Sequence, residues 1–248
     1  MRLATALVRA LDPVKFAQQV GMDCDSWQAQ LLRSRSDRIL VNCSRQSGKS
    51  TVAALLAVHV ALHEPDSLLL VVGPAERQSK ELFLKALSFY RGAGRPVVAE
   101  AENKLTLELE NGSRIVSLPG KASTIRGFSG VRLLILDEAA QIEDEAYSAL
   151  RPMLAVSGGG IIAMSTPWGR QGWWYSAWQS KEKWTRFEVP ATECPRISKE
   201  FLEEELRSQG QWVFAQEYEC KFMDGARSVF RGEDIDRIVR EEIEAWKL

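Results

Sequence analysis

The sequence predicts an α/β fold in which helices flank a mainly parallel central sheet. Three apolar runs, at residues 39–41, 68–72 and 131–136, lack the alternation of a half-exposed strand. Continuous runs of this kind are typical of strands that are buried on both faces, and such strands are mostly parallel. Stretches with helical spacing follow the first two runs, at residues 51–62 and 76–90. This alternation of strand and helix indicates a parallel sheet built from βαβ units.

The composition is that of an ordinary globular protein and carries no global signal for nucleic acid. The chain has 248 residues, of which 45% are hydrophobic and 26% are charged, and its formal net charge is -1. With that charge, DNA binding would have to come from a local basic patch. Residues 1–11 lack the apolar core of a signal peptide, and residues 52–62 are too short to cross a bilayer. We therefore expect no membrane partner.

The cysteines and histidines predict neither a disulfide framework nor a zinc site. The chain has four cysteines, without a C-x-x-C pair, and two histidines: Cys24, Cys43, Cys194, Cys220, His59 and His63. Structural zinc sites need four closely spaced ligands of these types, and this pattern does not supply them. A reducing compartment fits this cysteine usage best.

The N-terminal residues predict three short helices before the first strand. Residues 3–11 carry apolar side chains at helical spacing, and Asp12-Pro13 then favours a break and a second, capped helix. A third helix begins after Asp25 or Ser26, either of which can act as its N-cap. It contains Trp27 and Gln28.

Gln28 is a candidate for reading a base. Its amide both donates and accepts hydrogen bonds, so it matches the N6 and N7 positions of adenine, and it lies shortly before the first core strand. For Trp27, which precedes it, packing in the core is the simpler interpretation.

The most informative stretch is the loop between the first core strand and the helix at residues 51–62. Residues 43–51 match the phosphate-binding pattern G-x-x-x-x-G-K-[ST], except that Cys43 replaces the first glycine. Gly48 lets the backbone approach a phosphate, and the amides after it lie at a helix N-terminus, which favours an anion. Lys49 would contact the β- and γ-phosphates, and the Ser50 hydroxyl would ligate Mg²⁺. A chance Gly-Lys-Ser before a helix is the alternative for this loop.

We assign nucleotide binding to the whole of this loop and to the pair before the strand. The predicted nucleotide-binding residues are Trp27, Gln28, Ser44, Arg45, Gln46, Ser47, Gly48, Lys49, Ser50 and Thr51.

Residues 104–118 predict a β-hairpin. Alternating residues on both sides of Asn111-Gly112 form the strongest short-range signal for such a turn. We expect the hairpin to be an insertion at the sheet edge, outside the parallel core. The polar, Gly-flanked segment 120–127, which contains Arg126, is predicted to be an exposed loop.

The third core strand ends in two acidic residues, Asp137 and Glu138. Open parallel sheets bind ligands at this end of their strands, and after a phosphate-binding loop the pair is a Walker B arrangement. Asp137 would hold Mg²⁺, and Glu138 would orient and deprotonate the attacking water. Because side chains alternate along a strand, we do not expect both carboxylates to face the metal. A helix N-terminus with favourable acids is the alternative for this pair.

The remaining residues predict two further strands and the C-terminal helices. Residues 158–164 predict a strand that ends in Ser165-Thr166-Pro167, whose hydroxyls can contact the γ-phosphate or the catalytic water. A turn set by Pro167 is the alternative. Further segments are a strand at 184–189 and helices at 199–208, capped by Ser198, at 211–218 and at 233–247. The tryptophans Trp173, Trp174, Trp178 and Trp184 predict core or lid packing.

Taken together, the motifs resemble the large terminase subunit of tailed bacteriophages. The resemblance covers nearly the whole chain and rests on the pair at 27–28, Arg45-Gln46 ahead of Gly48-Lys49-Ser50, Leu136-Asp137-Glu138-Ala139, and Ser165-Thr166-Pro167. It implies a P-loop NTPase of the additional-strand (ASCE) type that hydrolyses ATP with Mg²⁺ to drive double-stranded DNA into a procapsid. It also implies the procapsid portal and the small terminase subunit as partners. The same resemblance implies that the protein assembles as a homo-oligomeric ring and is a monomer in isolation. It also implies a location in the host cytoplasm.

The resemblance further assigns roles to individual residues. It implies that Gln28 contacts adenine, that Arg45 contacts the phosphates, and that Ser165 and Thr166 couple hydrolysis to movement. Arg126 is similar to a candidate arginine finger that acts on a neighbouring subunit. The catalytic residues implied in this way are Glu138, Arg45, Arg126 and Thr166.

The resemblance predicts an ATPase domain at residues 1–222 and a linker-like tail at residues 223–248. Members of the family normally carry a nuclease domain of the RNase H type, so we interpret this chain as the ATPase half without nuclease activity. Two alternatives stay open. A helicase-like or recombination ATPase would need further nucleic-acid motifs and a second ATPase domain, and a nucleotide-binding assembly module would hydrolyse little as a monomer.

Overall fold

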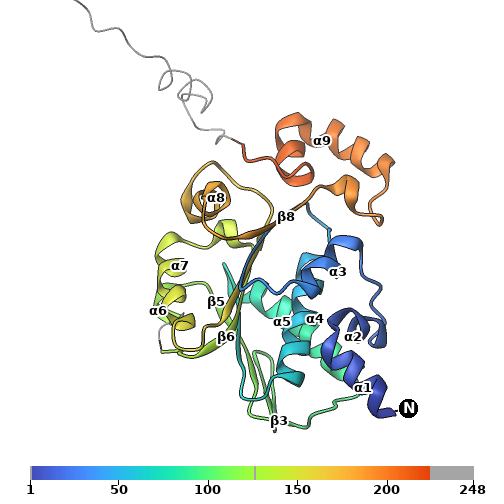
Figure 1. The fold of residues 1–248 in the computed structure, drawn as a ribbon. Helices are drawn as coiled ribbons and strands as arrows, with labels where there is room; N and C mark the ends of the chain where they lie inside the picture. Colours follow the sequence, from blue (N-terminus) through green and yellow to red (C-terminus); the bar gives the residue numbers. More distant parts are fainter. Residues whose placement is uncertain (1, 126, 224–248) are drawn as a thin grey trace, which may run out of the picture.

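An eight-stranded sheet runs through the centre of the computed structural model, with helices on both faces (Figure 1). The structure describes residues 2–125 and 127–223. The strand order is β3-β4-β5-β2-β6-β7-β1-β8. The strands are β1 Arg38–Cys43, β2 Leu68–Gly73, β3 Ala99–Glu102, β4 Thr106–Leu109, β5 Arg114–Pro119, β6 Val131–Asp137, β7 Gly160–Ser165 and β8 Thr185–Val189.

The sheet is mainly parallel, as the continuous apolar runs predict. The neighbouring strands β5, β2, β6, β7, β1 and β8 all pair in parallel, whereas β3 and β4 add an antiparallel edge. Strand β7 lies between β1, which leads into the phosphate-binding loop, and β6, which ends at Asp137. This inserted strand defines an ASCE-type P-loop fold and confirms the predicted fold class.

The helices form two layers that cover opposite faces of the sheet. Figure 1 shows α1 to α5 on one face, α6 to α8 on the other, and α9 beside α3 at one end. The helices are α1 Arg2–Leu11, α2 Pro13–Gln19, α3 Ser26–Arg33, α4 Lys49–His63, α5 Glu76–Gly92, α6 Ala122–Ile125, α7 Asp144–Leu150, α8 Gly172–Gln179 and α9 Lys199–Tyr218. Three short 3-10 turns complete the fold: η1 Ala139–Gln141, η2 Arg151–Leu154 and η3 Ala191–Glu193.

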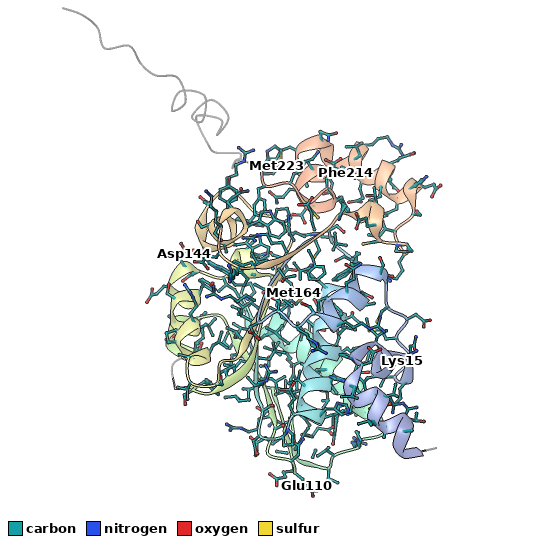
Figure 2. All side chains as sticks on the ribbon, in the orientation of Figure 1. Lys15, Glu110, Asp144, Met164, Phe214 and Met223 are labelled. Atoms are coloured by element: carbon teal, nitrogen blue, oxygen red, sulfur yellow. The ribbon has the colours of Figure 1, made fainter. Side chains whose placement is uncertain are left out.

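The two layers explain why the core strands are apolar throughout. In β2, Leu69 and Val71 pack into the core under α2 to α5, whereas Leu70 and Val72 pack into the core on the other face. Successive side chains of a strand point to opposite faces, so a sheet covered on both sides needs an apolar residue at every position. Figure 2 shows Met164 of β7 at the centre of this arrangement.

The predicted hairpin exists, but its placement outside the parallel core was wrong. Strands β4 and β5 are antiparallel around Asn111-Gly112, and Leu109 N–H donates to the Ser113 carbonyl at 2.9 Å. Strand β5 also pairs in parallel with β2 over its whole length, and its Ile115 is fully buried. The hairpin therefore extends the central sheet, since its second strand completes one side of it.

Segment 120–127 also differs from the exposed loop that its composition predicts. Residues Ala122–Ile125 form the short helix α6, and the Ile125 side chain is fully buried in the core beside α7. One apolar residue in a polar segment is enough to anchor it to the core. Arg126 lies outside the described residues.

The helix caps and the C-terminal helices follow the sequence closely. Asp12 accepts the Val14 N–H at 3.0 Å, and Ser198 accepts the Phe201 N–H at 3.2 Å, so both predicted N-caps are confirmed. The two predicted helices at 199–218 appear as α9 with a break at Gly210, whose φ is 77°. The predicted helix at 233–247 lies outside the described residues. No helix in the described part of the chain is long and apolar enough to cross a membrane.

Candidate active site

The phosphate-binding loop connects β1 to α4 and depends on Gly48. Gly48 is the N-cap of α4 and has a φ of 89°, a left-handed conformation that strains other residues. A Cβ at this position would lie 2.7 Å from Nε2 of Gln28, so a larger residue would also have to displace that side chain. Gln46 also has a positive φ, of 61°, which gives the loop its sharp curvature.

Cys43 stands where the usual loop pattern has its first glycine, and the structure explains the substitution. It is the last residue of β1, it is fully buried, and its Sγ lies 3.8 Å from the Ser165 carbonyl. A strand position does not need the conformational freedom of glycine. Burial raises the pKa of the Cys43 thiol to about 11, so the group is neutral at pH 7 and acts as a packing residue.

Lys49 lies at the first position of α4 and faces the end of β6. Its Nζ is 3.1 Å from Oε1 of Glu138, and its side chain is largely buried. Burial alone would lower the pKa of Lys49, but the carboxylates of Glu138 and Asp137 act against burial, and the pKa is raised. The lysine is therefore held as a cation, as phosphate binding requires.

The hydroxyl and carboxylate expected to hold Mg²⁺ are in contact. Ser50 Oγ donates to Oδ2 of Asp137 at 2.9 Å, and Asp137 is only 6% exposed. Burial raises the pKa of Asp137, an effect that Lys49 partly offsets. These hard oxygen donors at a helix N-terminus fit Mg²⁺, which binds proteins through one or two carboxylates and takes its other ligands from water and phosphate. Across residues 2–125 and 127–223, no group of three or more His, Cys, Asp or Glu forms an all-protein metal cage.

Asp137 and Glu138 both face the loop, although they contact different residues in it. Asp137 contacts Ser50, whereas Glu138 contacts Lys49. We expected alternation along the strand to point the two carboxylates in different directions. That rule does not hold here, because β6 ends at Asp137 and Glu138 adopts a left-handed conformation with a φ of 50°. The two carboxylates therefore differ in their partners because of this turn and not because of the pleat of the strand.

Lys49, Ser50 and Glu138 border a cavity of about 550 Å³, lined mainly by polar groups. Eight predicted site residues line it: Arg45, Gln46, Gly48, Lys49, Ser50, Thr51, Glu138 and Thr166. The predicted metal ligand Asp137 does not line this cavity. It lines a smaller neighbouring cavity of about 370 Å³ together with Glu138, Arg77, Gln78 and Glu81. The first cavity is comparable in size to many small-ligand sites.

Four predicted nucleotide-binding residues do not line this cavity. Ser44 and Ser47 are fully buried within the loop. Trp27 is 5% exposed and packs in the core under α4, as the simpler interpretation predicts. Gln28 is 2% exposed; its Oε1 accepts the Asp25 N–H at 3.0 Å, and its Nε2 lies against Gly48.

The strand end at Ser165-Thr166 adjoins the Walker B residues. Ser165 Oγ accepts the Ala140 N–H at 3.2 Å and thereby connects β7 to the turn that follows Glu138. Thr166 is mostly buried, yet it lines the cavity. The two hydroxyls therefore have different positions: Ser165 is structural here, and Thr166 faces the space that a ligand would occupy.

Arg45 has a protein partner as well as a place at the cavity. Its Nε donates to Oε2 of Glu217 in α9 at 2.6 Å, while its backbone N–H donates to the Glu217 carbonyl at 3.0 Å. A guanidinium here can reach a phosphate in the cavity only in competition with this carboxylate.

Sequence reasoning missed six other residues that line the cavity: Gln78, Lys85, Gln141, Trp168, Arg196 and Glu217. Arg196 and Glu217 come from the C-terminal part of the chain, where no motif marks them. Gln78 and Lys85 lie on α5, whose N-terminus follows β2 at the ligand-binding edge of the sheet. This position was the signal that could have identified Gln78 and Lys85, because a helix that begins at the ligand-binding edge borders a bound ligand.

The chain matches terminase large subunits over most of its length. The family model described as "Terminase large subunit, T4likevirus-type, N-terminal" matches residues 40–237. The terminase large subunit of Thermus virus P23-45 is 26% identical over 258 aligned residues, which cover 89% of this chain and 53% of that protein. The chain thus spans about half the length of the curated relatives it matches.

Solved structures with the same fold include large terminases from a Thermus phage and from another, thermophilic bacteriophage. The ATPase domain of the Thermus phage P74-26 large terminase has a TM-score of 0.74 and 23% identity, covering 84% of this chain and 98% of that one. The large terminase of the other, thermophilic bacteriophage, in complex with ADP, has a TM-score of 0.65 and 14% identity, covering 80% of this chain and 54% of that one. At these identities the likeness shows the fold.

Proposed function

The chain belongs to the family of terminase large subunits of the T4likevirus type, within their N-terminal region, and from this we propose that it is a Mg²⁺-dependent ATPase that drives double-stranded DNA into a procapsid. The observation that carries the proposal is the convergence of four side chains. Lys49 meets Glu138, and Ser50 meets Asp137, at the carboxyl ends of β1 and β6, the two core strands that flank β7. Residues of these types at this edge supply the phosphate-binding cation, the Mg²⁺ ligands and the base that phosphoryl transfer from ATP to water uses.

Each of these residues has a distinct task in the proposed reaction. Lys49 and the amides at the start of α4 bind the β- and γ-phosphates, and Thr166 contacts the γ-phosphate or the water. Glu138 accepts the proton of the attacking water. Ser50 and Asp137 would hold Mg²⁺, which when bound neutralises the charge that develops on the phosphates.

The solved relatives support nucleotide as the ligand. The large terminase of that thermophilic bacteriophage has been captured in complex with ADP and with ATP-γ-S. We carry this ligand class over to the present chain, with residues 1–222 as the ATPase unit and residues 223–248 as a segment that leads out of it. The portal, the small terminase subunit and DNA are the proposed partners in the host cytoplasm, and a homo-oligomeric ring is the proposed working form.

A test of the proposal compares phosphate release by the parent with that by Lys49→Ala. Loss of the point charge on the phosphates should abolish turnover, whereas Lys15→Ala on α2, at a residue that does not line the cavity, should turn over ATP like the parent. Equal turnover by the parent and Lys49→Ala would reject the proposed site.

The second candidate function, an assembly module with little activity as a monomer, is distinguished by protein concentration. If neighbouring subunits complete the site, the rate per chain rises with concentration, whereas a self-sufficient ATPase gives a constant rate per chain. A helicase-like or recombination ATPase instead predicts turnover that increases with single-stranded or recombining DNA.

A further inference from the structure

Arg196 joins two parts of the candidate site that are far apart in the sequence. It lies between η3 and α9 and lines the cavity. Its Nη1 and Nη2 donate to the two carboxylate oxygens of Asp25 at 2.8 and 2.7 Å. The same Nη2 donates to the Ser47 carbonyl at 3.0 Å. One guanidinium therefore connects the N-cap of α3 to the phosphate-binding loop.

The backbone of Asp25, whose side chain Arg196 binds, also orients the Gln28 amide. The Asp25 N–H donates to Oε1 of Gln28 at 3.0 Å, which leaves Nε2 against Gly48. The two ends of an amide look alike in shape, so its orientation is set by its hydrogen-bond partners. Gln28 is almost fully buried and keeps the position that these neighbours give it.

We propose that Arg196 is a positioning residue that clamps the first turn of α3 to the phosphate-binding loop and so sets the affinity and adenine selectivity of the site. This rests on the proposed function and on the adenine contact that the family resemblance implies for Gln28. Adenine presents the N6 donor beside the N7 acceptor, whereas guanine presents two acceptors at the same edge. The Gln28 amide offers one acceptor and one donor, which match adenine and not the two acceptors of guanine. When the clamp is released, the amide is no longer held at a fixed distance from the phosphates, and this preference weakens.

The contacts of Arg196 favour a role as a clamp over a role as a cation that attracts phosphate. Asp25 takes both arms of the Arg196 guanidinium, and its side chain is only 11% exposed. A carboxylate in this position cancels much of the positive charge that a phosphate would meet. The planar fork of arginine fits such a three-way contact, and lysine cannot reproduce it.

The two roles predict opposite results for Asp25→Asn and Arg196→Lys. In a clamp, Asp25→Asn weakens ATP binding about tenfold and narrows the difference between ATP and GTP, and Arg196→Lys does the same. In an electrostatic role, Asp25→Asn exposes an uncompensated cation and tightens ATP binding, and Arg196→Lys binds like the parent. Equilibrium titration of each variant with ATP and GTP separates the two, and the second pattern would overturn the proposal.

Hydrogen exchange of the full chain without nucleotide tests the clamp independently of ligand binding. Arg196→Ala and the near-isosteric Asp25→Asn should raise exchange at residues 25–28 and 46–50. Arg132→Ala is the matched control, because Arg132 makes a two-armed contact with Glu64 far from this cavity. Unchanged exchange in both test variants would refute the clamp. A parent that binds neither nucleotide would instead reject the proposed function, while the exchange result would still stand.

Discussion

Arg45 Nε and Glu217 Oε2 are 2.6 Å apart, and this ion pair joins the phosphate-binding loop to the last turns of α9. The Arg45 side chain is 66% exposed, whereas that of Glu217 is 10% exposed. The carboxylate is thus the fixed partner and the guanidinium the movable one. Both residues line the same cavity, so a nucleotide phosphate and Glu217 compete for Arg45.

We predict that Glu217→Gln tightens ATP binding about two- to fivefold. The amide keeps the shape of the side chain but removes a negative charge that repels phosphate and holds Arg45. An exposed ion pair contributes roughly 0.2–1 kcal/mol, which sets the size of the effect. Titration with ATP at low and high salt measures it, and the gain should shrink as salt rises.

Glu219→Gln is the matched control for this prediction. Glu219 pairs with Lys221 at 2.7 Å and does not line the cavity, so its substitution should leave ATP affinity unchanged. Weaker binding by Glu217→Gln would show that the ion pair supports the loop in a binding conformation.

We predict that Asp137→Asn stabilises the nucleotide-free protein while it weakens the response to Mg²⁺. Burial raises the pKa of Asp137 above its unfolded value of about 3.9, so ionisation costs folding free energy. Below about pH 4 the carboxyl is protonated in both states and the cost is absent. The cost appears as pH rises through the raised native pKa, and the advantage of the Asn variant should therefore grow towards neutral pH.

Thermal unfolding between pH 4 and pH 8 measures this difference. A stabilisation of ~1 kcal/mol corresponds to a melting temperature about 2–4 °C higher in a protein of this size. Asp23→Asn, at an exposed position, should melt like the parent at each pH. A destabilised Asp137→Asn at pH 7 would mean that the contacts with Ser50 and Lys49 outweigh burial.

The fold was largely predictable because its determinants are local. Continuous apolar runs identify strands buried on both faces, and the loop at Gly48 and the acids at Asp137 each follow such a strand. The pairing of β5 with β2 was not predictable in this way, because a hairpin signal specifies its own turn and not the strand beside it. Strand β3 is short, and its alternating Ala and Glu residues are uncommon in strands, so it was missed.

The site was predictable where it depends on motifs and not where it depends on tertiary contacts. Lys49, Ser50, Asp137 and Glu138 come together as their positions in strand, loop and helix dictate. The left-handed conformation of Glu138 was not expected, because few residues other than glycine adopt it and no glycine marks the position. Arg196 and Glu217 reach the loop through α9 and the segment before it, whose packing no local pattern records.

For Arg126, which lies outside the described residues, the prediction comes from the sequence. If it acts as an arginine finger on a neighbouring subunit, Arg126→Ala should bind ATP like the parent but lose turnover that depends on assembly. Such a finger contributes roughly 10³–10⁵-fold in rate. Mixing Arg126→Ala with Lys49→Ala should restore part of the activity, because one variant supplies an intact site and the other an intact finger.

The control for the mixing experiment is each variant alone at the same total concentration, with assembly verified. A mixture that is as inactive as either variant alone would show that Arg126 does not act on a neighbouring subunit.

Glu138→Gln, followed by both ATP binding and phosphate release, is the most direct test of the proposed ATPase. The amide oxygen can still accept a hydrogen bond from Lys49, but the amide cannot accept the proton of the attacking water. We predict ATP affinity within about threefold of the parent and a turnover lower by roughly 10²–10⁴-fold. Glu143→Gln, at an exposed position before α7, should behave like the parent in both measurements. Parental turnover by Glu138→Gln would contradict the account, because the site would then hydrolyse ATP without the base that the structure places beside Lys49.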